Sequence, residues 1–106
     1  MVPRLQKEKA EVFLKYHQDR EILVLLNSWD IGSSKLVEAC GYKAIATTSM
    51  GIAASLGYPD CEVIQLPEMI EVVRGIVHAV QVPVSVDFEA GYGRTTAEVV
   101  DSVNRI

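Results

Sequence analysis

Two acidic residues and two glycines follow a short apolar run near the end of this 106-residue chain. Asp87 and Glu89 are two positions apart, and Gly91 and Gly93 come shortly after them. The run Val82–Val86 is typical of a short buried strand, so both acids should stand at its carboxyl end. Proteins of the α/β class build their sites at this end of the strands. The spacing therefore points to carboxylate chemistry, with a bound metal ion as the first candidate.

Polar clusters follow two earlier strand candidates in the same way. Asn27–Asp30 follows the apolar run Ile22–Leu26, and Thr48–Gly51 follows Lys43–Thr47, with Asp60 further along. In a parallel sheet the carboxyl ends of the strands share one rim, so these loops should converge with the two acids after the third strand. Carboxylates are ligands that Mg²⁺ prefers, and Mn²⁺ is an alternative. No His or Cys lies among them at a spacing typical of zinc.

The same acids also have a purely structural interpretation. Carboxylates at strand ends are often solvated or cap the next helix, and spacing alone leaves both interpretations open. The Gly-x-Gly turn, which allows close backbone approach, and the third acid on a neighbouring loop favour the metal.

The hydrophobic pattern predicts alternating helices and strands. Besides the three strands above, we expect helices over Arg4–Gln18, from Asp30 to Gly41, over Ile52–Leu56 as a short turn, over Pro67–Val80, and from a cap at Thr95 or Thr96 to Ile106. This alternation favours right-handed parallel crossovers in an α/β fold. No glycine-rich dinucleotide or phosphate-loop fingerprint follows a strand.

Composition narrows the class of protein. The net charge is -4, and half of the ten basic residues lie in the first twenty positions, so the remainder is acidic and nucleic acid is not expected as a partner. No apolar run approaches the ~20 residues of a membrane span, and no secretory signal is visible. Two cysteines are too few for a disulfide scaffold. We expect a cytoplasmic globular protein.

Three ordered segments resemble the isocitrate lyase and phosphoenolpyruvate mutase family, which includes methylisocitrate lyase, phosphonopyruvate hydrolase and oxaloacetate-cleaving enzymes. They read NSWDIGSSKLVEACGYKAI, ATTSMGIAASLGYPD and PVSVDFEAGYG, and the match runs from about Leu25 to Gly93. The resemblance implies a (β/α)₈ TIM barrel, which needs roughly 250 residues. We therefore expect residues 1–106 to form a single partial barrel domain, with an N-terminal helix and about the first three (β/α) units, truncated relative to the family.

The resemblance also implies roles for individual residues. Asp87 corresponds to the acid that binds the metal directly, whereas Glu89 and Asp60 correspond to acids that reach it mainly through water. Catalytic roles are expected for Asp60, Thr48 and Ser49.

Substrate contacts are expected from the loops after the first two strands and from an arginine behind the glycines. The expected substrate-binding residues are Trp29, Asp30, Thr48, Ser49, Met50, Gly51 and Arg94. For Arg94 a solvent-facing side chain is an equally good interpretation.

The activity implied by the resemblance is that of a Mg²⁺-dependent lyase or mutase acting on small 2-oxo or 2-hydroxy carboxylates. Such an enzyme cleaves or rearranges a C–C or P–C bond, and the metal stabilises the charge on an enolate oxygen. Glu89 replaces the more usual Asp, and Ser49 replaces a Gly, which leaves the substrate open. The family's Lys-x-Cys-Gly loop, with its acid/base cysteine, would lie beyond Ile106.

Two other interpretations stay open. In the first, the chain is an inactive truncated fragment. In the second, it is a non-catalytic half-barrel that binds carboxylate or phosphate and functions only through assembly. A homo-oligomer is expected in any case, because a three-stranded parallel sheet left alone exposes apolar edges and faces. Cys61 does not match the lyase cysteine, so we expect a half-buried structural thiol there.

Overall fold

The computed structural model describes residues 4–106, in which helices and strands alternate. The elements are α1 (Arg4–Gln18), β1 (Leu26–Ser28), α2 (Ile31–Ala39), β2 (Ile45–Thr47), α3 (Ser49–Ser55), α4 (Leu66–Ala79), β3 (Val84–Ser85) and α5 (Thr96–Arg105). Within these residues, no helix is both long and apolar enough to span a bilayer. The predicted order of helices and strands is confirmed.

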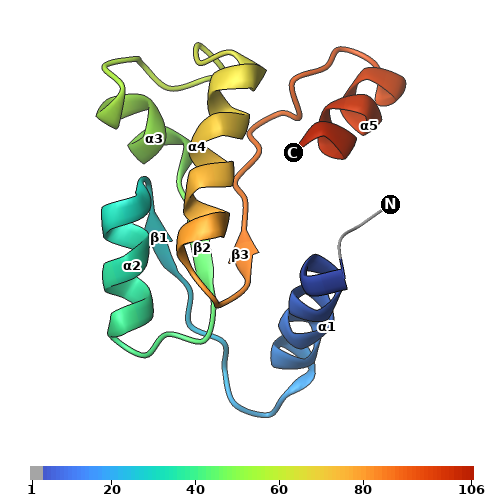
Figure 1. Cartoon of the computed structure of the whole chain (residues 1–106). Coiled ribbons are helices and arrows are strands. Elements are labelled where there is room, and N and C mark those ends of the chain that lie inside the picture. The colour runs from blue at the N-terminus through green and yellow to red at the C-terminus, as the bar shows by residue number, and fades with distance from the viewer. Residues whose placement is uncertain (1–3) are drawn as a thin grey trace.

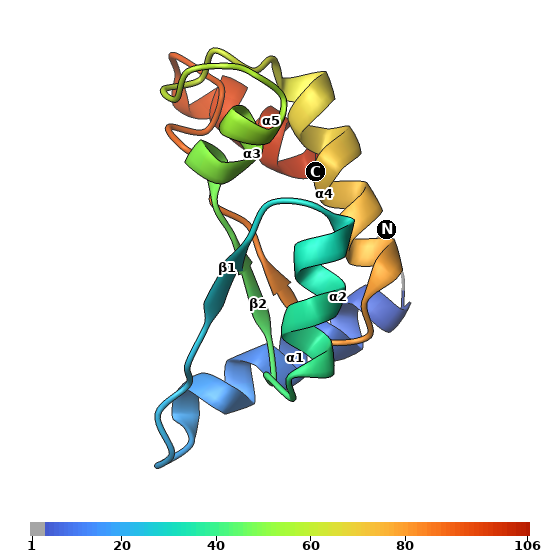
Figure 2. The same cartoon turned by 90° about the vertical axis from the view of Figure 1, so that its left-hand side faces the viewer.

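The three strands form one parallel sheet in the order β1-β2-β3. Leu26 of β1 is paired with Ile45 of β2, which is paired with Val84 of β3. Helices α2 and α4 lie along one face of this sheet (Figures 1 and 2). The loops that follow the strands lie together with α3 and α5 beyond the carboxyl ends, while α1 lies at the opposite end. The arrangement is the one required to bring the predicted polar loops to one rim.

The first strand begins later than predicted. Of the expected run Ile22–Leu26 only Leu26 belongs to β1, because pairing with β2 starts there. The preceding residues run along the open edge of the sheet, where Ile22 is 85% exposed and Val24 is 54% exposed. The branched apolar residues of this run thus correctly predicted an extended backbone, but they did not predict buried side chains.

The short helix also differs from its predicted bounds. It begins at Ser49, not at Ile52, because the Thr48 side chain caps it by accepting a hydrogen bond from the Gly51 N–H at 3.3 Å. The helix therefore starts directly at the rim, and part of the predicted substrate loop is helical.

Two hydrophobic clusters hold the layers together. One consists of Ile52, Ala53, Ile64, Met69 and Val73, with Val86 and Tyr92 packed against it. The other consists of Val37, Ile45 and Val80. The first cluster packs α3 against α4 directly below the rim, so burial of apolar surface fixes the loops that carry the acids.

Helix ends are fixed by local contacts. Asp30 caps α2 in a reciprocal capping box with Ser33, and Gly41 follows that helix with a φ of 87°, as its position predicts. Glu38, on the last turn of α2, accepts hydrogen bonds from the N–H groups of Gln81 and Val82 at 2.6 and 3.1 Å. This carboxylate ties α2 to the segment that enters β3.

The prediction that Cys61 is a half-buried structural thiol is wrong, because Cys61 is exposed. Cys61 and Glu62 have φ values of 74° and 57°, so the chain turns sharply in the left-handed region at this loop. The turn holds the thiol away from the hydrophobic clusters.

Candidate active site at the carboxyl rim

Asp87 is anchored to the neighbouring strand and to the helix that follows it. Its Oδ2 accepts hydrogen bonds from the hydroxyl and the N–H of Ser49 at 2.7 and 3.1 Å. Its own N–H donates to the Thr47 hydroxyl at 2.9 Å, and its Oδ1 accepts from the Glu89 N–H at 3.1 Å. The end of β3 is therefore fastened to the end of β2, and the Asp87 carboxylate is held in one orientation.

These hydrogen bonds favour the ionised form of Asp87. The Ser49 hydroxyl is the main reason that the pKa of Asp87 lies below its usual value, and the N–H groups of Ser49 and Glu89 act in the same direction. Burial opposes them without reversing the shift. The rim thus carries a fixed negative charge at neutral pH.

A second group of acids lies beside Asp87. Burial is the main reason that the pKa of Glu89 lies above its usual value, and contact with the Asp60 carboxyl group and the charge of Glu62 raise it further, while the Glu62 N–H opposes them. Asp60 and Glu89 come from different loops, so the convergence of these acids agrees with the expected common rim. Repulsion between like charges therefore contributes to the raised pKa of Glu89.

Sequence reasoning missed Glu62, Tyr92 and Thr47 as members of the rim. The Glu62 carboxylate accepts a hydrogen bond from the Tyr92 N–H at 2.8 Å, and this contact joins the two acidic loops. A signal for Glu62 was present, since Asp60 and Glu62 repeat the Asp-x-Glu spacing found after β3. Thr47 gave no comparable signal, because a threonine at a strand end is common.

Most backbone donors of the predicted substrate loop are already used within the chain. The Thr48 N–H donates to the Ser28 carbonyl oxygen at 3.0 Å, the Ser49 N–H donates to Asp87, and the Gly51 N–H donates to the Thr48 hydroxyl. Ser49 is buried, whereas Met50 is 63% exposed. The main contact of this loop is therefore with the Asp87 carboxylate, which Ser49 holds in place. Met50 is the residue of the loop that faces solvent.

Trp29 lies against the start of α3. A methyl group built on Gly51 would approach the Trp29 Cβ at 3.1 Å and the Thr48 Cγ2 at 2.6 Å, so only glycine fits there. Trp29 is 43% exposed, so part of its side chain faces solvent at the rim. Of the residues expected to bind substrate, Trp29, Thr48, Ser49 and Gly51 thus lie together.

Asp30 and Arg94 are placed differently. Asp30 Oδ1 accepts the Ser33 N–H at 2.7 Å, and this bond is the main reason that the pKa of Asp30 lies below its usual value. The contacts of Asp30 are those of a helix cap. Arg94 is exposed, its N–H donates to Glu98 Oε2 at 2.7 Å, and Thr95 is the cap of α5.

Within residues 4–106, no three His, Cys, Asp or Glu side chains form a ready metal-binding group. One orphaned atom does fit a cation. The Oε2 atom of Glu89 is buried and makes no hydrogen bond to the described residues. A buried carboxylate oxygen without a donor is unusual, and a cation or its bound water would satisfy it.

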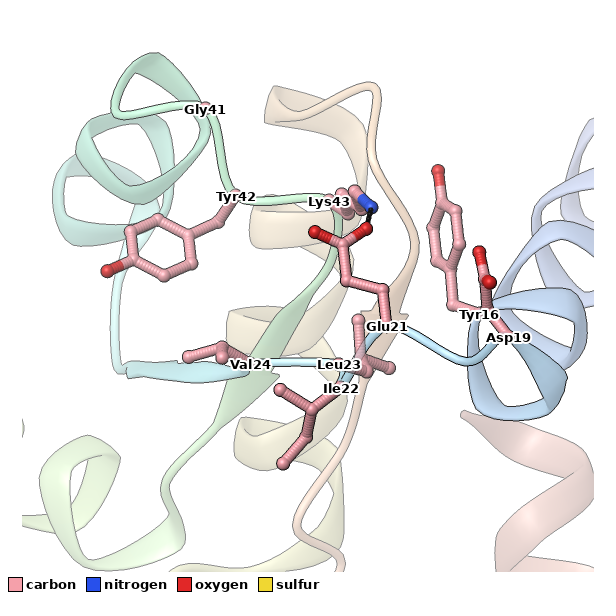
Figure 3. Close-up of a pocket in the computed structure, with 9 residues that line it drawn as sticks. All are labelled: Tyr16, Asp19, Glu21, Ile22, Leu23, Val24, Gly41, Tyr42 and Lys43. Carbon is pink, nitrogen blue, oxygen red and sulfur yellow. Dashed lines mark hydrogen bonds and ion pairs between the residues drawn. The ribbon is translucent and has the colours of Figure 1, made fainter.

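Two hollows lie away from the rim. A groove of about 510 Å³ runs between α1, α4 and β3, and a hollow of about 150 Å³ lies at the amino ends of β1 and β2. The smaller hollow is lined by Tyr16, Asp19, Glu21, Ile22, Leu23, Val24, Gly41, Tyr42 and Lys43 (Figure 3). There Glu21 and Lys43 face one another as an ion pair and neutralise one another. The rim holds the anchored Asp87 carboxylate and the Glu89 and Asp60 pair, and it is the better candidate.

Comparisons with known proteins identify the family to which the chain belongs. A family model described as phosphoenolpyruvate phosphomutase matches residues 13–106. The 2-methylisocitrate lyase of Halalkalibacterium halodurans is 26% identical over 106 aligned positions, which cover 94% of this chain and 35% of that enzyme.

Solved structures show the same likeness. A Burkholderia cenocepacia protein assigned as a lyase or mutase has a TM-score of 0.90 and 34% identity, over 97% of this chain and 36% of that one. An oxaloacetate acetylhydrolase in complex with its product oxalate has a TM-score of 0.82 and 26% identity, over 92% of this chain and 35% of that one. The chain thus spans about a third of the length of these relatives. The predicted family and the predicted fold, parallel units of a TIM barrel, are confirmed.

Replacing Ser49 with alanine should destabilise the chain in a pH-dependent way. The folded-state pKa of Asp87 is lowered, so its ionised form contributes stability that is present above the unfolded-state pKa and is lost as pH falls through the folded-state pKa. Because Asp87 is exposed, we expect a loss of only about 1 kcal/mol at pH 7. The loss should shrink below about pH 4. Urea unfolding at pH 7 and pH 3 measures both values.

Ser55→Ala is the matched control, because the Ser55 hydroxyl donates to the uncharged Ile52 carbonyl at 2.8 Å. Its effect should be the same at both pH values. An equal, pH-independent loss in both variants would contradict the importance of the Ser49 contact for Asp87.

Proposed function

Because the chain belongs to the phosphoenolpyruvate phosphomutase family, we propose that it supplies metal-binding and substrate-binding parts of an enzyme for small 2-oxo or 2-hydroxy carboxylates. The reaction would be cleavage or rearrangement of a C–C or P–C bond next to a carbonyl group. The observation that carries the proposal is the anchoring of Asp87 by Ser49, with Asp60 and Glu89 beside it.

The proposed cofactor is Mg²⁺, with Mn²⁺ as a substitute. Asp87 would bind the ion directly, while Glu89 and Asp60 would act through water. Mg²⁺ keeps several waters and takes only one or two protein carboxylates, so a site of this kind does not need a three-ligand cage. The bound ion would supply Lewis acid chemistry at the carbonyl of the substrate.

The chain's own residues would bind and orient the reactants. Ser49 holds Asp87 in one rotamer, so the ionised carboxylate is ready without reorganisation. Thr48 and Trp29 border the rim, and Met50 would cover the apolar part of a substrate. Arg94, whose guanidinium makes no ion pair within residues 4–106, is available for a substrate carboxylate.

The names of the relatives support this substrate class. One relative is named as a lyase of 2-methylisocitrate, and another was solved with oxalate. Both compounds carry carboxylates, which an arginine and a divalent cation can bind together. A cytoplasmic location, without nucleic acid or membrane partners, belongs to the same proposal.

A thermal shift experiment with Mg²⁺ and oxalate tests the proposal. A ligand at a hundred times its dissociation constant adds about 2.7 kcal/mol of stability. We therefore expect Tm to rise by several degrees with both compounds present, and by less with either alone. Asp87→Asn should abolish the rise.

Asp101→Asn, on an exposed part of α5, is the control and should keep the full rise. If Asp87→Asn responds as well as the unchanged chain, the metal assignment is wrong. Turnover of oxaloacetate and 2-methylisocitrate by the same samples then reports whether this chain is active by itself or supplies a binding rim only.

Assembly is a second proposed property, favoured by exposed apolar side chains. Ile22 and Val24, just before β1, and Leu26, its first residue, are all exposed. Val100 and Val103 on α5 are each 53% exposed. An open strand edge with apolar side chains favours pairing with another chain. We propose that the chain associates with itself through the β1 edge.

Sedimentation velocity tests this association. The unchanged chain should sediment as a species larger than 11.7 kDa, and Ile22→Lys with Val24→Lys should return it to the monomer. Leu36→Lys, at an exposed apolar position on α2, is the control and should leave the assembly intact. A monomeric unchanged chain at micromolar concentration would refute the proposal.

A further inference from the structure

Two serine hydroxyls are fully buried behind the first loop of the rim. Ser28 is the last residue of β1 and Ser34 lies near the start of α2, and each is 0% exposed. Their hydroxyl oxygens are 2.8 Å apart, and the Ser34 hydroxyl is also 2.7 Å from the Asp30 carbonyl oxygen. A buried hydroxyl without a partner is costly, so both serines depend on these contacts.

The two contacts fix the directions of the hydrogen bonds. A hydroxyl carries a single proton, and a carbonyl oxygen can only accept. Ser34 therefore donates to the Asp30 carbonyl oxygen, and Ser28 donates to Ser34. The reverse direction between the serines would leave the Asp30 contact without a proton. The hydroxyls thus form a relay from the end of β1 to the carbonyl group two residues later.

This relay is one part of a firm hold on the backbone around Trp29. Ser33 Oγ accepts hydrogen bonds from the N–H groups of Trp29 and Asp30 at 3.1 and 3.2 Å. The Ser28 carbonyl oxygen accepts from the Thr48 N–H at 3.0 Å. The residues on both sides of Trp29 are therefore fastened, to α2 on one side and to the residue that caps α3 on the other.

The Trp29 side chain lies between this hold and the solvent. Its Cβ lies against Gly51 of α3, and the residue is 43% exposed. A side chain whose backbone is fixed by the fold needs little further ordering when a ligand binds beside it, and such preorganisation favours binding. The placement of Trp29 at the rim is therefore decided by the serines of α2.

We propose that Ser34 is a positioning residue of the rim, which through Ser28 and the Asp30 carbonyl holds Trp29 in a preformed position beside the substrate. The inference rests on the proposed function, in which Trp29 borders the substrate. Ser34 is buried and touches no substrate, so it acts only through the backbone that carries Trp29.

Trp29 is the only tryptophan of the chain, so the fluorescence of the folded protein reports its surroundings. Ser34→Ala removes the relay, and it should shift the emission to longer wavelength and increase quenching by acrylamide. Ser55→Ala is the matched control, because the Ser55 hydroxyl also donates to a carbonyl group of its own helix. This control should leave both signals unchanged. Unchanged emission and quenching in folded Ser34→Ala would overturn the inference.

The double variant Ser28→Ala with Ser34→Ala separates positioning from stability. Ser34→Ala alone leaves the buried Ser28 hydroxyl without its acceptor, whereas the double variant removes both partners and should unfold at a higher urea concentration than Ser34→Ala. The Trp29 emission of the double variant should nevertheless stay shifted. Recovery of the emission together with the stability would overturn the inference. The double variant also carries the test if Ser34→Ala does not fold.

Titration with oxalate in the presence of Mg²⁺ measures the consequence for binding. Ser34→Ala should weaken oxalate binding by about two- to tenfold, which corresponds to the cost of ordering one side chain on binding. Ser55→Ala should bind oxalate as the unchanged chain does. Equal affinities in the unchanged chain and in Ser34→Ala would overturn the role of Ser34 in binding.

The fluorescence and binding measurements separate this inference from the proposed function. If the unchanged chain binds no oxalate but the Trp29 emission shifts in Ser34→Ala and in the double variant, the proposed function fails and the positioning of Trp29 by Ser34 stands. If oxalate binds equally well to both chains and the emission does not move, the proposed function stands and the inference fails.

Discussion

The hydrogen bond between the Ser49 hydroxyl and Asp87 is the contact on which the rest of the rim depends. It joins the end of the third strand to the start of the helix after the second strand, and the N–H of Ser49 and the hydroxyl of Thr47 reinforce it. The hydrophobic cluster that contains Ile52 and Met69 packs α3 against α4 and so fixes the position of Ser49 at the start of α3. The packing of the fold and the ionised state of Asp87 are therefore parts of one arrangement.

The rim also concentrates negative charge. Asp87 is held ionised by its donors, whereas burial and acidic neighbours disfavour the charge on Glu89. Two acids two positions apart thus differ in their ease of ionisation because one has several donors and the other has an orphaned oxygen. Such a difference is typical of functional sites. It is the electrostatic basis of the divalent cation site proposed for this end of the sheet.

The order of elements, the parallel sheet and the shared rim could be predicted from the sequence, because apolar periodicity and the Asp-x-Glu spacing are local signals. The late start of β1 could not be predicted, because Ile22 and Val24 have the composition of a buried strand but no partner strand beside them. The same limit applies to Ser49, whose hydroxyl is engaged by a residue 38 positions away. Glu62 was within reach of sequence reasoning, since its spacing from Asp60 repeats that of the predicted pair.

The central claim is that the carboxylates of separate loops share one cation at the rim, and NMR with Mn²⁺ tests it most directly. Paramagnetic broadening falls off steeply with distance from the ion, so substoichiometric Mn²⁺ should first broaden the amide signals of Ser49 and Glu89, followed by that of Asp60. The signals of Glu21 and Asp19, at the opposite end of the sheet, should stay sharp. Broadening centred on Glu21, or spread evenly over all exposed acids, would contradict the account.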